Sequence, residues 1–102
     1  MSERIEQLQE LYGMLMEELS GSEKYSEMAC AYKTKNPEMA KKFDANASDE
    51  MKHAGVIEQE IINVVKAAGA ESKEAVIHEF MKKAIHDGWM RAKNAQSCYK
   101  GG

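Results

Sequence analysis

Two pairs of side chains between residues 18 and 53 have the spacing of a metal site. Glu18 precedes Tyr25 by seven residues, and Glu50 precedes His53 by three. On an α-helix with 3.6 residues per turn, the members of each pair share a face. The surrounding positions on these faces are small or apolar: Leu11, Leu15, Ser22 and Ala29 around Glu18, and Phe43, Ala47, Ile57, Ile61 and Val64 around Glu50. A carboxylate in such a setting needs a proton, a charged partner or a metal ion, and a neighbouring imidazole favours the metal.

The elements that must position these side chains are three helices in one domain, residues 1–102. We expect them at about 3–35, 37–68 and 73–99 from their apolar periodicity. Asn36 and Pro37 form a helix start, Gly69 a helix stop, and Ser72 the cap of the third helix. Two glycines inside the first helix, Gly13 and Gly21, each cost about 1 kcal/mol relative to alanine and weigh against an unbroken helix.

Short connections predict that the first two helices fold back as an antiparallel hairpin. Glu18 lies near the middle of the first helix, and Glu50 and His53 lie near the middle of the second. The hairpin therefore brings these three side chains to one level, where they can converge on one ion. Cys30 lies off this stripe and is not an expected ligand.

Composition excludes several classes of partner. The chain has 102 residues, 43% hydrophobic and 30% charged, with a formal net charge of −3, which gives no basic footprint for nucleic acid. No segment approaches the roughly 20 apolar residues of a membrane span, and the amino-terminal segment has no signal-peptide pattern. Two cysteines, Cys30 and Cys98, do not make a disulfide framework or a Cys-x-x-Cys site. A reducing cytoplasm is the expected location.

The combined pattern resembles a known family. The first helical hairpin of rubrerythrins, and of the wider ferritin-like superfamily, is similar to residues 11–68, through Glu18, Tyr25, Ala29, Ala40, Phe43, Ala47, Glu50, His53 and Ala54. The resemblance implies an all-α fold, a ferritin-like antiparallel hairpin plus a third helix. Family di-iron sites take a glutamate from each of two helices and a Glu-x-x-His from each of the other two. This chain carries one of each, so a four-helix di-metal bundle would be completed by dimerisation.

Among family members this layout is most similar to the short encapsulated ferritins. The resemblance implies a ferroxidase-type oxidoreductase for iron storage or detoxification, with ferrous iron and oxygen or peroxide as reactants. Glu50 would bridge the metals, Glu18 would be a terminal ligand, His53 would bind as a neutral imidazole, and Tyr25 would act as a catalytic residue that orients a carboxylate. Two iron ions per dimer would balance four carboxylates; manganese or zinc also fits.

The same resemblance bears on the partners. A homodimer or a higher even-numbered homo-oligomer is expected. An encapsulin shell is a further candidate, but residues 95–102 lack the Gly-Leu/Ile-rich targeting peptide of encapsulin cargo.

Two other functions stay open. One is a rubrerythrin-like peroxide or oxygen reductase, which would need an external electron donor because the chain has no rubredoxin-like Cys-x-x-Cys pairs. The other is a non-catalytic metal-binding helical interaction module. In this reading Glu50 and His53 form an ordinary intrahelical pair, and Tyr25 is a core tyrosine.

Some positions admit a second interpretation. Glu17 is the inward residue if the first helix rotates near Gly13, although the spacing to Tyr25 favours Glu18. His78 and His86 have no third ligand at a suitable spacing and are interpreted as surface residues. The third helix carries a broad apolar stripe that includes Phe80 and Ile85; it either covers the hairpin of its own chain or reaches across to another copy.

Overall fold

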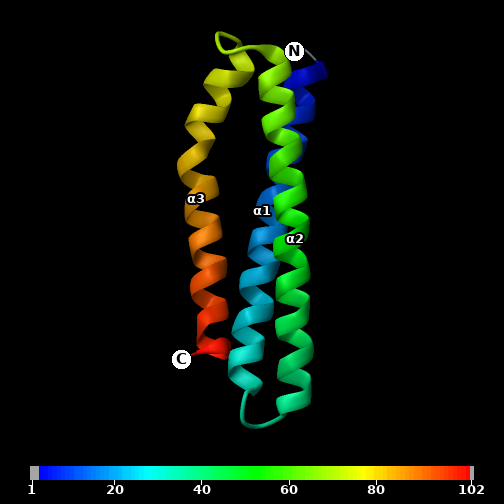
Figure 1. Cartoon of the computed structure of the whole chain (residues 1–102), viewed down its shortest axis with the longest axis vertical. Coiled ribbons are helices and arrows are strands. Elements are labelled where there is room, and N and C mark those ends of the chain that lie inside the picture. The colour runs from blue at the N-terminus through cyan, green and yellow to red at the C-terminus, as the bar shows by residue number, and fades with distance from the viewer. Residues whose placement is uncertain (1–2, 102) are drawn as a thin grey trace.

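The computed structural model describes residues 3–101, which form three α-helices and no strand. The helices are α1 (Glu3–Tyr32), α2 (Pro37–Ala68) and α3 (Lys73–Lys100). In Figure 1 they run down, up and down in a narrow bundle of 52 × 19 × 17 Å. The prediction of an all-α fold with a helical hairpin and a third helix is confirmed. No helix within residues 3–101 combines the length and hydropathy needed to cross a membrane.

Local capping chemistry sets the start of α2 and the loop that follows it. Asn36 accepts a hydrogen bond from Met39 N at 3.2 Å, and Pro37 takes the first helical position. Gly69 ends α2 with φ of +100°, a conformation that favours glycine. Ser72 caps α3 by accepting a hydrogen bond from Ala75 N at 3.1 Å. All three capping predictions are confirmed.

Helix α1 ends three residues earlier than the sequence suggested. Residues 33–35 form a turn, in which Asn36 N donates to Tyr32 O at 2.9 Å. The physical reason is that Asn36 must leave helical geometry to cap α2, and the residue before a proline avoids the helical region. Gly13 and Gly21 do not interrupt α1, because packing against two other helices outweighs their weak propensity.

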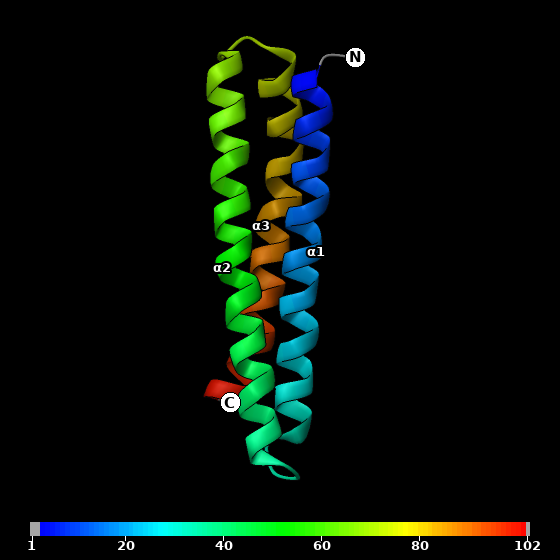
Figure 2. The same ribbon diagram turned by 90° about the vertical axis from the view of Figure 1, so that its right-hand side faces the viewer.

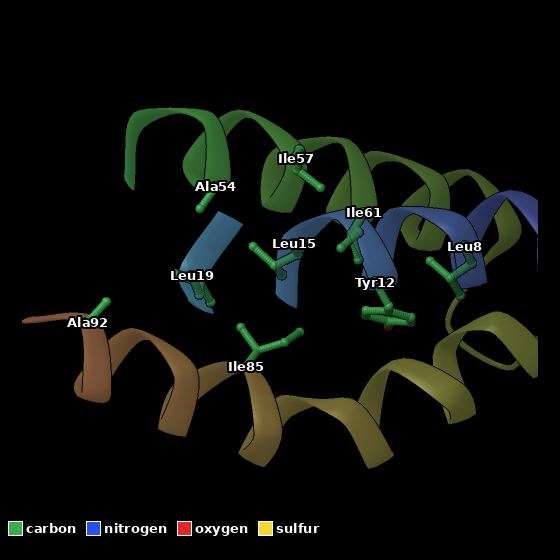
Figure 3. Packing of buried hydrophobic residues seen from close by; sticks show 9 residues of the cluster. All are labelled: Leu8, Tyr12, Leu15, Leu19, Ala54, Ile57, Ile61, Ile85 and Ala92. Carbon is green, nitrogen blue, oxygen red and sulfur yellow. The ribbon is translucent and has the colours of Figure 1, made fainter. Parts of the chain in front are cut away.

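The core runs along the centre of the bundle, where α3 packs mainly on α1. Figure 3 shows its members: Leu8, Tyr12, Leu15, Leu19, Ala54, Ile57, Ile61, Ile85 and Ala92. Helix α3 therefore covers the hairpin of its own chain. The predicted apolar stripe on α3 is wrong at Phe80, which is 82% exposed. The predicted stripe is wider than the part of α3 that α1 and α2 can cover.

Polar and covalent links attach α3 to the hairpin. Trp89 Nε1 donates to Glu58 Oε1 of α2 at 2.9 Å. Near its carboxyl end, Gln96 Nε2 donates to Ser48 Oγ at 2.9 Å. Cys98 forms a disulfide with Cys30 of α1, across 68 residues of sequence.

This disulfide corrects the sequence interpretation of the two cysteines. Their distance in sequence hid the pairing, because only the packing of α3 on α1 brings their Cα atoms to 5.8 Å. Disulfides persist in oxidising compartments. The pairing does not fit the reducing environment that was expected, and the cytoplasmic location stays a prediction.

Candidate metal centre

Helices α1 and α2 bring Glu18, Glu50 and His53 together halfway along the bundle. One ligand atom from each side chain lies within 4.8 Å of the other two. His53 Nδ1 is 3.4 Å from Glu18 Oε2. The three residues that the sequence selected as ligands therefore converge, and in the described part of the chain no other group of three histidine, cysteine or acidic residues does so.

The register of the two helices at this level is fixed by a buried hydrogen bond. Ser22 Oγ donates to Ala47 O at 2.9 Å, and both residues are fully buried. Since Ser22 is one turn after Glu18 and Ala47 is three residues before Glu50, this bond holds the two carboxylates opposite each other. Glu17 is exposed, so Glu18 is the inward residue, as its spacing to Tyr25 suggested.

The cluster lies at the edge of the bundle, with an uneven exposure to solvent. The Glu18 side chain is 26% exposed, whereas His53 is 61% exposed. Glu18 Oε2 is shielded from solvent and accepts no well-aligned hydrogen bond, although His53 Nδ1 lies 3.4 Å away. A shielded carboxylate oxygen without a well-aligned donor is costly, and a metal ion at this position would satisfy it.

The electrostatics of the cluster favour a proton or a cation. The pKa of Glu50 is raised, first by a side-chain hydrogen bond with Glu18, and further by burial and by the negative charge of Glu18. The charge of His53 acts in the opposite direction. Two carboxylates that share a site cannot both ionise easily without a counter-charge. A divalent cation would supply that charge and displace the proton.

Sequence reasoning missed one residue of this site. A Cβ atom placed on Gly21 would lie 2.9 Å from Glu50 Oε2, so the carboxylate occupies the space that any other side chain would need. Gly21 had been considered only as a weak helix former. The signal that was available is its position, one turn after Glu18 in the middle of a helix.

The rubrerythrin family profile matches residues 14–86, a range that includes the whole cluster and Tyr25. This chain belongs to the rubrerythrin family. Searches of curated proteins and of solved structures gave no match. Rubrerythrins generally bind a pair of iron ions, and the donor set of two carboxylates and one imidazole suits iron in its chemistry.

Within the rubrerythrin pattern, Tyr25 has a different neighbour from the one expected. Its ring stacks on Phe43, with 6.2 Å between ring centroids. Among the described residues it forms no hydrogen bond to Glu18 or Glu50. Its packing role is evident, and its catalytic role stays a prediction.

The histidines of α3 lie apart from the rubrerythrin cluster, and the two differ. His86 is exposed, but His78 is half-buried, and a hydrogen bond of 2.8 Å joins its Nδ1 to the Tyr12 hydroxyl. The interpretation of His78 as an ordinary surface residue is therefore wrong, because the packing of α3 on α1 gives its ring a partner.

Proposed function

We propose that two copies of this chain share a di-iron centre that oxidises ferrous iron. The observation that carries the proposal is the convergence of Glu18, Glu50 and His53, with a shielded Glu18 oxygen that accepts no well-aligned hydrogen bond. One chain supplies half of the donor set that a family site uses, two carboxylates and one imidazole against four and two. A twofold partner would supply the other half.

The surface around the cluster has the pattern of a helical interface. The residues in question, here called the site face, alternate in steps of four and three, as in a coiled-coil seam. They are Met14, Glu18, Gly21, Tyr25, Met28 and Tyr32 on α1, and Met39, Phe43, Asn46, Glu50 and His53 on α2.

Large apolar side chains on the site face are exposed in the single chain. The exposed fractions are 50% for Met14, 41% for Met28 and 37% for Tyr32. Exposed apolar surface rimmed by polar residues is typical of interaction sites. Its distribution on both sides of the cluster supports a second copy that covers the centre and excludes water from it.

The chain's own groups would bind ferrous iron as substrate and manage its charge. Glu18 and Glu50 would lose their shared proton on binding, and His53 would bind through the nitrogen that faces Glu18. Two ferrous ions would each give one electron to dioxygen, which takes two protons and leaves as hydrogen peroxide. The four carboxylates of the dimer would stabilise the ferric products by their negative charge.

The test is to load the protein with ferrous iron without oxygen, and to measure iron content and solution mass together. About one iron per chain, found only in an even-numbered oligomer, is the expected result. Admission of oxygen should then consume about one dioxygen for two iron ions. Glu50→Ala should abolish both iron binding and oxygen uptake.

Other outcomes separate the rival functions. Rapid peroxide turnover with an added reductant, and little ferric product, would indicate a peroxide reductase. A protein that binds metal without consuming oxygen, and that keeps its assembly after His53→Ala, would be a non-catalytic module. An iron-free, stable monomer would contradict the proposal.

A further inference from the structure

Gly21 lies in the middle of α1 and is not needed for any turn. A glycine at such a position costs about 1 kcal/mol relative to alanine. The space beside Gly21 that a side chain would occupy is filled by the Glu50 carboxylate of α2, which lies against the α1 backbone there. The Oε2, Cδ and Cγ atoms of Glu50 would be 2.9, 3.5 and 3.9 Å from a Cβ on Gly21.

The other glycine within α1 provides a contrast. A Cβ on Gly13 would have no atom within 4 Å apart from its own helix and chain neighbours, and the residue is exposed. Both glycines weaken the same helix. Only Gly21 makes room for a side chain of the cluster.

We propose that Gly21 is a positioning residue, which determines where the Glu50 carboxylate lies relative to Glu18 and His53. The inference rests on the proposed metal centre and extends it to a residue that binds no metal. The nearest atom to a new Cβ is the far end of a flexible side chain. Alanine at this position would therefore move the carboxylate and leave the bundle intact.

Displacement of the carboxylate matters because metal sites tolerate little error. Distances between ligand and metal vary by only about 0.2 Å in well-formed sites. A methyl group on residue 21 would lie 2.9 Å from Glu50 Oε2. This distance must increase by several tenths of an ångström, so the carboxylate must move. The expected loss is therefore in metal affinity and ligand geometry.

The experiment compares Gly21→Ala with Gly13→Ala in the full chain, with cobalt(II) as the probe. Both variants should raise the metal-free melting temperature by about 4 °C, because each removes a helical glycine. Gly13→Ala should bind cobalt within about twofold of the wild-type affinity. Gly21→Ala should bind about 10-fold more weakly, and its visible cobalt spectrum should change.

A second-site variant tests whether the effect passes through Glu50. Glu50→Asp shortens the side chain by one methylene group, so its carboxylate clears a Cβ on residue 21. Adding Gly21→Ala to Glu50→Asp should therefore cause no further loss of cobalt affinity. Such non-additivity is expected only if the two positions contact each other.

Contrary results are distinct from failure of the metal centre itself. Cobalt affinity and spectrum of Gly21→Ala equal to those of Gly13→Ala would overturn the positioning role and leave the centre intact. Unfolding of Gly21→Ala would also overturn it, because displacement of a side-chain end cannot unfold the bundle. Absence of cobalt and iron binding in the wild type would instead remove the proposed function.

Discussion

At the scale of single residues, a proton and the proposed metal ion would compete for Glu50. Its raised pKa means that the folded, metal-free state binds the proton more tightly than the unfolded chain does. The stability from this proton is fully present below the ordinary value of 4.5, and it is lost as pH rises through the raised folded value. Metal binding should therefore release protons and weaken at acidic pH.

Glu50→Gln separates these two effects. The neutral amide removes the proton equilibrium, so the metal-free variant should melt at a higher temperature than the wild type at pH 7 and at a similar temperature at pH 4. Its affinity for cobalt should fall by at least about 100-fold, the upper range for loss of a supporting group. Glu27→Gln, at an exposed position on α1, is the matched control and should change neither property.

Tyr12 should make the stability of the bundle fall at alkaline pH. Burial raises its pKa from 10.0 to about 12, so the folded state favours the neutral phenol. The contribution of Tyr12 to stability should be constant below pH 10 and should be lost as pH rises from 10 toward 12. Tyr12→Phe should remove this alkaline loss but cost about 1 kcal/mol at pH 8, because His78 loses its hydrogen-bond partner. Urea unfolding at pH 8 and pH 11 measures both; an unchanged alkaline loss would contradict the assignment.

At the scale of elements, the disulfide holds the end of α3 against α1. A cross-link between residues 68 apart stabilises a fold by about 4 kcal/mol in the chain-entropy treatment. Reduction should lower the free energy of unfolding by about this amount. Cobalt affinity should be unchanged, because α3 packs on a different side of α1 from the site face. The double variant Cys30→Ser, Cys98→Ser should show the same loss without responding to reductant.

The elements also show where sequence reasoning succeeds and fails. Asn36, Gly69 and Ser72 act on residues within four positions of themselves, so their effects are visible in the sequence. Glu18 and Glu50 lie at the same height along the hairpin because one short loop joins α1 to α2. The pairing of Cys30 with Cys98 and the contact of Tyr12 with His78 depend on the register of α3, which no local pattern specifies. Gly21 was missed because its role is to leave room for the Glu50 side chain of another helix, and the sequence of α1 alone does not show that contact.

At the scale of the whole molecule, the cluster lies near the midpoint of both hairpin helices. A twofold axis through it, perpendicular to the bundle, would overlay the two hairpins in full and in opposite directions. Charge favours this arrangement. Acidic side chains outnumber basic ones at the end with the α2–α3 loop (Figure 2), and the reverse holds at the end with the α1–α2 loop. Each end of one copy would then face the opposite charge.

The proposed dimer predicts that two substitutions, each of which replaces an exposed apolar side chain with glutamate, differ in their effect on dimerisation. Met28→Glu places a charge on the site face and should weaken the dimer by at least about 30-fold, or about 2 kcal/mol. Phe80→Glu alters a side chain that is 82% exposed on α3 and should leave dimerisation unchanged. Sedimentation equilibrium across protein concentrations measures both. Equal behaviour of the two variants would contradict a dimer through the site face.

The hydrogen bond between Trp89 and Glu58 allows tryptophan fluorescence to report on the position of α3. Trp89 is the sole tryptophan, and its indole N–H connects α3 to α2. Its fluorescence therefore reports whether α3 stays docked, and no dye or label is needed. A red shift on reduction of the disulfide would show undocking of α3, whereas an unshifted spectrum would show that packing alone holds the helix in place.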